Sequence, residues 1–262
     1  MGQTARKFFA DRGTHLAAMI AYFALLSFVP LVYLSLAVLG TAHQPASGSF
    51  FVRELQHAFP STSLKSILHA IRKIRAHATL LGAVGAGFLG WSSLSLFSVL
   101  ESAFNIVYGR PNRPFLRGKT LAAGMIVVSL GFLYVGLAAG SIGVGVARRY
   151  LGLGHNVVLA YGLVIAASLG ALFVFLTSAY LVLPNTPLSL KEVLPGAILA
   201  AVVLEATFQL LPEFVRLSQH NPVLQTLSGP AVLLVWLYLM ANVIVFGAEV
   251  NWNRRYGMSP KA

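Results

Sequence analysis

The hydrophobic residues of this chain gather in long runs that are separated by shorter polar connections. Six runs are long enough to cross the hydrocarbon core of a bilayer as helices, which takes about 20 consecutive apolar residues. They cover residues 15–40, 78–108, 121–147, 157–183, 190–211 and 230–252. Only helices and closed barrels satisfy their backbone polar groups in lipid, so runs of this length predict an all-α fold. We expect one domain over residues 1–262, a polytopic membrane bundle of six transmembrane helices.

An amphipathic segment lies in the connection between the first two runs, at about residues 50–76. Apolar side chains recur there at helical spacing on one side, and basic side chains occupy the other. The apolar set is Leu64, Ile67, Leu68, Ile71 and Ile74, and the polar set is Lys65, His69, Arg72 and Lys73. The pattern predicts an interfacial helix that binds anionic lipid through apolar burial and headgroup attraction. A lid that only packs on the bundle is the alternative.

The composition agrees with a membrane protein and indicates its partners. Hydrophobic residues make up 57% of the chain and charged residues 10%, whereas a soluble domain has roughly 25% charged residues. The formal net charge is +12, and the Lys and Arg residues lie almost entirely between the apolar runs. This favours anionic membrane lipids over nucleic acid as partners. Eleven of the 19 basic residues fall on the side of the two termini, which predicts that both termini are cytoplasmic.

Polar residues inside the spans are candidates for a substrate pathway. A charge at the bilayer centre costs about 2.5–3.5 kcal/mol on insertion scales, so such residues are paired, protonated or facing water. Helical spacing places three sets each on one helix face: Ser98, Glu101 and Asn105; Glu205 and Gln209; Tyr238, Asn242 and Glu249. Ordinary ion pairing is the alternative, since Glu101 is within reach of Arg110. Glu249 is likewise within reach of Arg254 and Arg255.

A short repeat links two of these sets. VLESAFN at residues 99–105 resembles VLEATFQ at residues 203–209. In a six-span bundle the two copies belong to the second and fifth spans, which run in opposite directions. Inverted repeats of three plus three helices are typical of secondary transporters, whose substrate site lies between the halves. A chance match in a chain rich in alanine and leucine is the alternative.

Two further patterns concern helix packing and helix ends. Small residues recur every four positions at Gly82, Ala86 and Gly90, and again at Gly162, Ala166 and Gly170. Such spacing lets membrane helices approach closely, so we expect seams within one subunit or between copies of a homo-oligomer. Ser189 and Glu192 have the spacing of a capping box, which predicts the start of the fifth span.

Catalytic chemistry has little support in this sequence. The chain has no cysteine, which argues against disulfides and thiol catalysis. Its seven histidines form no recognisable ligand pair with a carboxylate, which argues against a metal site. Gly118-Lys119-Thr120 lacks the first glycine of a phosphate-binding loop. We expect no enzymatic activity, no metal and no cofactor.

Four pieces of the sequence carry a family resemblance, and together they extend over nearly the whole chain. They are AYFALLSFVP at 21–30, GWS at 90–92 with ESAFN at 101–105, LPN at 183–185 with PGA at 195–197, and WLY at 236–238 with GAEVN at 247–251. With these pieces the chain resembles the YihY/BrkB family of bacterial inner-membrane proteins. It departs from the family at residues 227–230, which read LSGP where the family has a Tyr-Gly-Ser-like turn.

The resemblance implies a multi-pass protein of the bacterial inner membrane. Members of the family have carried a ribonuclease label and a virulence-factor label, and a role in moving lipids or other envelope components has been proposed. The ribonuclease label fits this sequence poorly, because RNA hydrolysis needs an acid–base pair or a metal site, and neither is visible.

Two functional hypotheses remain. In the first, the protein is a translocator or flippase of an anionic lipid or another amphipathic envelope component. The polar sets then line its pathway, and the basic residues Arg72, Lys73, Arg110 and Arg113 contact lipid headgroups. In the second, it is a non-transporting membrane scaffold for envelope partners, and the same glutamates only join helices.

Overall fold

The computed structural model describes residues 2–41, 81–129, 131–132, 157–220 and 229–257. The helices are α1 (Gly2–Ala10), α2 (Gly13–Thr41), α5 (Leu81–Val107), α7 (Val157–Val182), α8 (Leu190–His220) and α10 (Gly229–Tyr256). A further helix covers residues 115–129. All regular secondary structure within these ranges is helical, which confirms the predicted all-α class.

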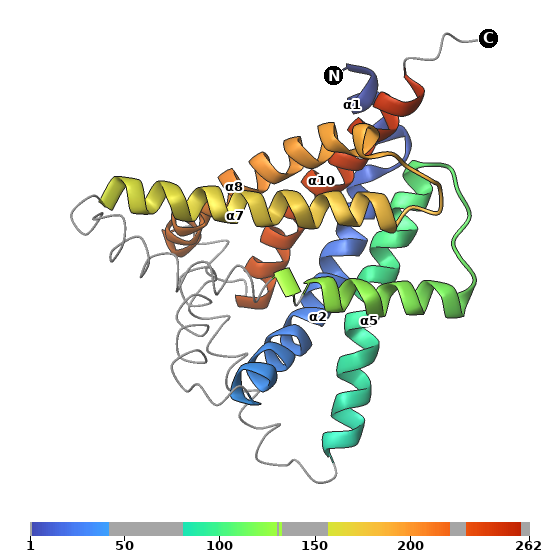
Figure 1. The fold of residues 1–262 in the computed structure, drawn as a ribbon. Coiled ribbons are helices and arrows are strands. Elements are labelled where there is room, and N and C mark those ends of the chain that lie inside the picture. Colours follow the sequence, from blue (N-terminus) through green and yellow to red (C-terminus); the bar gives the residue numbers. More distant parts are fainter. Residues whose placement is uncertain (1, 42–80, 130, 133–156, 221–228, 258–262) are drawn as a thin grey trace.

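Helix α10 lies at the centre of the bundle (Figure 1). It packs against α2 on one side and against α8 on the other, and it also contacts α1 and α5. Helix α2 in turn packs on α5, and α7 packs on α8. Helix α10 therefore joins two helix pairs.

Within the described residues, three helices are long and apolar enough to cross a membrane, over Ile165–Val182, Leu190–Leu210 and Ala231–Tyr256. They coincide with the predicted spans 157–183, 190–211 and 230–252. Helices α2 and α5 form where the spans 15–40 and 78–108 were expected, and α2 contains the shorter apolar helix Gly13–Phe28. The predicted interfacial segment 50–76 lies outside the described residues, so that segment and the count of six spans stay predictions.

The boundaries of two predicted spans differ in the structure. The third was expected to begin at residue 121, but its helix begins at residue 115. The first two turns carry Arg117 and Lys119, and their polarity hides a helix start that follows Pro114. Helix α8 continues to His220, beyond residue 211, because a helix does not have to end where its apolar run ends.

Glycine ends helix α5 and sets the direction of the loop that follows. Gly109 has a φ of +61°, in the left-handed region that favours glycine. The Arg110 N–H donates to the Asn105 carbonyl at 2.7 Å, and the Gly109 N–H donates to the Ile106 carbonyl at 3.0 Å. This pair of bonds is a Schellman motif. It turns the chain into the segment 110–114, which lies back against the bundle through the contacts described below.

The predicted capping box at the start of α8 is confirmed. The Glu192 carboxylate accepts hydrogen bonds from the Ser189 N–H at 2.7 Å and from the Ser189 hydroxyl at 2.9 Å. It also lies 3.7 Å from the Arg255 guanidinium. The box therefore satisfies a backbone donor that the first turn of a helix leaves unpaired.

Helices α8 and α10 approach each other closely where they cross. A Cβ atom on Gly196 would collide with the Gly247 carbonyl and with the Asn251 side chain, and one on Gly247 would collide with the Tyr180 hydroxyl. The Gly196 N–H donates to Asn251 Oδ1 at 2.7 Å. Small residues therefore form a seam here. The sequence pattern missed this seam because Gly196 and Gly247 each occur singly.

The seam expected on α7 is absent from the described part of the chain. Gly162, Ala166 and Gly170 are exposed, and a Cβ atom added at Gly162 or Gly170 would meet nothing within 4 Å. The α7–α8 contact instead leaves a hollow beside Ala166 and Gly170. These residues therefore form no packing seam within this subunit among the described residues, and a seam between copies of a homo-oligomer stays a prediction.

Four segments meet at one end of the bundle. The Lys7 ammonium on α1 donates to the Val107 carbonyl at the end of α5, at 2.9 Å. The Asn185 N–H, between α7 and α8, donates to Asn105 Oδ1 of α5 at 2.6 Å. Arg255 near the end of α10 donates to the Pro187 carbonyl. The two terminal helices, the end of α5 and the α7–α8 connection thus share one end of the molecule.

Candidate functional site

The first predicted polar set lies at the end of α5, where Glu101 is 5% exposed. Arg113 Nη1 lies 3.0 Å from Glu101 Oε1. The same guanidinium donates to three carbonyl oxygens at the end of α7, those of Val182, Leu183 and Pro184. The last carbonyls of a helix have no partner within the helix, and cations are favourable there. Arg113 therefore joins the α5 carboxylate to the end of α7.

Asn105 makes a second connection between the same segments. Its side chain is fully buried. Its amide donates to Asn112 Oδ1 at 3.0 Å, while its Oδ1 accepts the hydrogen bond from the Asn185 N–H. The Asn185 amide in turn donates to the Pro111 carbonyl at 3.0 Å. Both polar functions of Asn105 are thus used to hold the loops that follow α5 and α7.

The third member of this set, Ser98, contacts the helix formed by residues 115–129. The Lys119 ammonium donates to Ser98 Oγ at 3.1 Å, and the Ser98 hydroxyl donates to the Leu94 carbonyl at 2.8 Å. The segment 110–119 therefore covers the polar face of α5 that carries all three predicted residues. In place of the expected Arg110, Arg113 is the ion-pair partner of Glu101.

Glu205 on α8 has a different environment. Its carboxylate is 6% exposed. Ser168 on α7 donates to Oε2 at 2.7 Å, and Gln209, one turn along α8, donates to Oε1 at 2.8 Å. Within the described residues no cation lies at ion-pair distance from Glu205. Neutral donors alone therefore hold this carboxylate.

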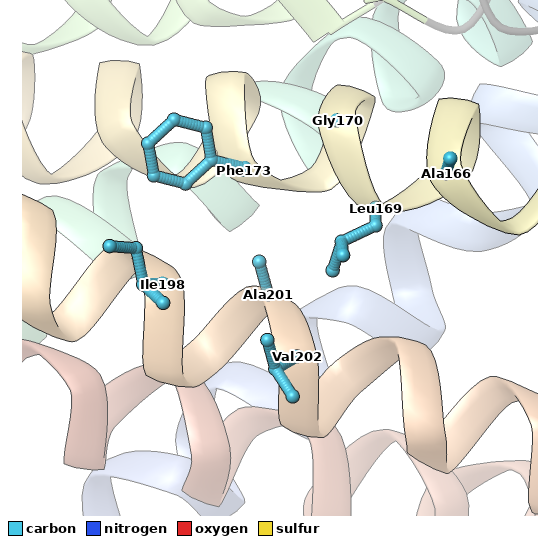
Figure 2. Close-up of a pocket in the computed structure, with 7 residues that line it drawn as sticks. All are labelled: Ala166, Leu169, Gly170, Phe173, Ile198, Ala201 and Val202. Atoms are coloured by element: carbon cyan, nitrogen blue, oxygen red, sulfur yellow. The ribbon is translucent and has the colours of Figure 1, made fainter.

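An apolar groove of about 360 Å³ lies between α7 and α8, on the same face of α8 as Glu205. Figure 2 shows its walls, which are Ala166, Leu169, Gly170 and Phe173 from α7 and Ile198, Ala201 and Val202 from α8. Glu205 follows Ala201 by four residues, so it lies one helical turn beyond the groove on the same face. Its partner Ser168 precedes Leu169 directly. The groove and the carboxylate together make an elongated site with apolar walls and one polar end.

The third predicted set lies on α10. Glu249 is fully buried, and its Oε2 lies 3.0 Å from Lys7 Nζ of α1. Lys7 also pairs with Asp11 and lies over the Trp252 ring, 4.3 Å from its centroid. The expected partners Arg254 and Arg255 were therefore the wrong choice, because the basic residue that reaches Glu249 comes from the other terminus.

Tyr238 and Asn242, the other predicted residues of α10, are half-buried. The Asn242 amide donates to the Tyr238 carbonyl at 2.7 Å, within the helix. The predicted pathway residues thus lie in three places: the end of α5, the α7-facing side of α8, and α10. That they line one pathway stays a prediction.

The residues predicted to contact lipid headgroups have different surroundings. Arg113 is committed to Glu101 and to the end of α7, whereas Arg110 is exposed beside Gly109. Arg72 and Lys73 lie outside the described residues. Several residues that contact the predicted sets were not predicted to do so from the sequence, among them Lys7, Ser168 and Asn112. Lys7 and Ser168 are far along the chain from their partners, and Asn112 lies beyond the turn at Gly109, so helical spacing identifies none of them.

The sequence pieces that carry the family resemblance contact one another in pairs. The Ser27 hydroxyl of the first piece donates to the Ser92 carbonyl of the second, at 2.6 Å. Asn105 accepts from Asn185, and Gly196 donates to Asn251, as described above. The pieces therefore hold α2 to α5, α5 to the α7–α8 connection, and α8 to α10.

Comparison with known proteins agrees with these pieces. The sequence profile of the family described as Virulence factor BrkB matches residues 4–261. A UPF0761 membrane protein of Pseudoalteromonas translucida (strain TAC 125) is 28% identical over 250 residues, which cover 92% of this chain and 81% of the relative. A UPF0761 membrane protein of Aeromonas salmonicida (strain A449) is 28% identical over 255 residues, which cover 94% and 85% of the two chains.

A longer relative, a UPF0761 membrane protein of Aromatoleum aromaticum (strain DSM 19018 / LMG 30748 / EbN1), is 29% identical over 253 residues. The match covers 94% of this chain and 61% of that relative, and two further relatives are covered to 60% of their length. No solved structure matches this chain. With a profile match that extends over nearly all of its residues, this membrane protein belongs to the BrkB family.

Proposed function

We propose that this protein translocates an anionic lipid, or another amphipathic envelope component, across the bacterial inner membrane, with both of its termini in the cytoplasm. The observation that carries the proposal is the apolar groove between α7 and α8, with Glu205 one turn beyond it. Apolar cavities in proteins stay dry. In a bilayer, a groove between two membrane-spanning helices is therefore filled by hydrocarbon, and the acyl chain of a lipid supplies it.

Glu205 gives this groove its polar end. Among the described residues, the donors to the Glu205 carboxylate are the neutral side chains of Ser168 and Gln209. A charged carboxylate in a membrane helix with such partners keeps most of the free-energy cost of its charge. A proton, or a cationic group of a lipid headgroup, would relieve that cost. Glu205 is thus suited to carry a proton or to meet such a headgroup while the lipid chain lies along Ala201 and Val202.

Scaffolding is the second candidate, and a specific observation favours it. Glu101 and Glu249 both form ion pairs that join separate segments, to Arg113 and to Lys7. At these two positions the carboxylates stabilise the bundle without facing an open path. A non-transporting scaffold for envelope partners needs no more than this.

A lipid-flip assay distinguishes the two candidates. Purified protein is placed in liposomes that contain a headgroup-labelled anionic lipid, and the label on the outer leaflet is quenched chemically. Glu205→Gln removes the charge, and Gly170→Leu fills the groove with a side chain. Gly124→Leu is the matched control, because it adds the same side chain at another exposed and open helix position, on a helix that does not line the groove.

Translocation predicts that wild type and Gly124→Leu move label faster than protein-free liposomes, and that Glu205→Gln and Gly170→Leu move label more slowly than wild type. The result that opposes it is a wild-type rate equal to that of protein-free liposomes, with several anionic lipids and under an imposed proton gradient. Scaffolding would then be the better account of the protein's function.

A further inference from the structure

Lys119 places a positive charge beside the apolar part of α5. It belongs to the helix formed by residues 115–129, which lies across α5 in Figure 1. Its ammonium contacts Ser98, which precedes the end of α5 at Val107 by nine residues. At 1.5 Å per residue this is about 13 Å from the helix end. The charge is therefore not at the polar end of the helix, where most membrane cations lie.

No carboxylate among the described residues neutralises Lys119. Glu101 lies on the same face of α5, but its Oε1 is paired with Arg113. Its Oε2 faces the backbone of Gly118, where an added Cβ would lie 3.2 Å away. The single hydrogen-bond acceptor of Lys119 in the described residues is the neutral Ser98 hydroxyl. Since an ammonium carries three donors, two remain available.

Two exposed aromatic rings flank this ammonium. It lies 5.4 Å from the centroid of the Trp91 ring and 5.7 Å from that of the Phe115 ring. Trp91 is 62% exposed and Phe115 is 67% exposed, so both rings face the surroundings of the bundle. Lys119 itself is half-buried, so its charge lies between two aromatic rings that are open to the surroundings.

The magnitudes show that the rings alone do not compensate the charge. A cation–π contact at an exposed site contributes about 0.5–1 kcal/mol. The cost of burying a lysine in a membrane is larger than this and rises toward the bilayer centre. Two rings and one hydroxyl therefore leave the ammonium short of a full partner, and an anion from outside the chain would supply it.

We propose that Lys119, Trp91 and Phe115 form a binding site for the phosphate group of a lipid. Lysine binds phosphate as a compact point charge, and tryptophan combines an apolar ring with an N–H donor. The exposed Leu116 beside Phe115 offers apolar surface to the lipid chains. This deepens the proposed function, on which it rests for the class of the transported molecule, by naming the headgroup chemistry and the residues that meet it.

Native mass spectrometry in a neutral detergent tests the site without any transport step. The probes are phosphatidylglycerol, a diacylglycerol with the same acyl chains and no phosphate, and inorganic phosphate as a competitor. Lys119→Gln removes the charge. Arg117→Gln is the matched control, because it removes the same charge from an exposed position in the same helix turn.

Wild type and Arg117→Gln are expected to retain phosphatidylglycerol, whereas Lys119→Gln loses at least about tenfold in binding, which corresponds to about 1.4 kcal/mol. Diacylglycerol lacks the phosphate, so it is not expected to bind at this site in wild type or in either variant. Millimolar inorganic phosphate that displaces the lipid would assign the site to free phosphate and overturn the lipid part of the proposal. Equal lipid binding by wild type and Lys119→Gln would overturn the whole of it.

Trp91→Leu is a second variant that tests the site if Lys119→Gln does not fold. The Trp91 side chain is exposed, so its replacement should have little effect on packing. Trp91→Leu removes the indole N–H that this site offers to the phosphate, and loss of one such hydrogen bond predicts at least about twofold weaker phosphatidylglycerol binding. Unchanged binding by this variant would count against the site. If wild type binds the lipid at this site but does not flip it, the site stands and translocation is refuted. If wild type flips the lipid and Lys119→Gln binds it as well as wild type does, translocation stands and the site is refuted.

Discussion

Arg113 Nη1 lies 3.0 Å from Glu101 Oε1, and the same guanidinium donates to three carbonyl oxygens at the end of α7. One side chain from the loop after α5 therefore links α5 to the end of α7, although these two helices are about 80 residues apart in the chain. The planar fork of arginine, with five donors, suits this task, whereas the three donors of a lysine radiate from one point.

Arg113→Ala is expected to destabilise the protein by about 3–5 kcal/mol, because it leaves Glu101 buried without a cation and frees the α7 carbonyls. Arg113→Lys should recover only part of this loss, since it restores charge without the fork. Thermal unfolding in detergent measures both. Arg117→Ala, at an exposed position, should change the free energy of unfolding by no more than about 0.5 kcal/mol. Full recovery by Arg113→Lys would show that the carbonyl contacts contribute nothing.

Lys7→Met is expected to be similarly costly, at about 3–5 kcal/mol, because Glu249 is fully buried and Lys7 is its ion-pair partner. Adding Glu249→Met to Lys7→Met should restore much of the stability, since a buried ion pair exchanged for apolar side chains is often neutral. The four proteins of this cycle are compared by unfolding in detergent. Arg6→Met, on the exposed side of α1, is the control. Equal losses from Lys7→Met and Arg6→Met would contradict the anchoring role of Lys7.

Gly196→Ala and Gly162→Ala should change stability in opposite directions. The added methyl group at Gly196 would collide with the Gly247 carbonyl and the Asn251 side chain, and such overpacking costs about 1–3 kcal/mol. At Gly162 it would meet nothing within 4 Å, so the helix propensity of alanine should stabilise α7 by up to about 1 kcal/mol. Unfolding temperatures in the same detergent compare the two. A stable Gly196→Ala variant would mean that the two helices cross less closely than described.

The positions of the long helices along the chain were predictable, because the thickness of the bilayer sets the length of each apolar run. The ranges of α7, α8 and α10 follow the sequence pattern within a few residues, apart from the extension of α8 to His220. The capping box at Ser189 was also predictable, since both of its partners lie within one turn.

Side-chain partners were much less predictable than helices. Helical spacing correctly placed Ser98, Glu101 and Asn105 on one face of α5, but spacing carries no information about which segment covers that face. The nearest arginine in sequence, Arg110, was the expected partner of Glu101, yet the Schellman turn at Gly109 directs the chain so that Arg113 reaches it. The two copies of the repeat also differ in their partners. Gln209 donates to Glu205, whereas Asn105 holds two loops.

The side of the membrane faced by the termini is testable because the chain has no cysteine, so single cysteines report their own accessibility. Gln3 and Arg110 are both exposed, and the hydrogen bond from Lys7 to the Val107 carbonyl places α1 and the end of α5 at the same end of the bundle. A membrane-impermeant maleimide should leave Gln3→Cys and Arg110→Cys unmodified in intact spheroplasts and modify both after permeabilisation.

Arg149→Cys, in the connection that the sequence places on the opposite side, serves as the control that is modified in intact spheroplasts. Modification of both Gln3→Cys and Arg110→Cys before permeabilisation would reverse the proposed orientation and keep the fold. Modification of only one would place them on opposite sides, which requires an odd number of crossings between them. That result would contradict the structure, because α2 and α5 run between these residues and bring the chain back to its starting end.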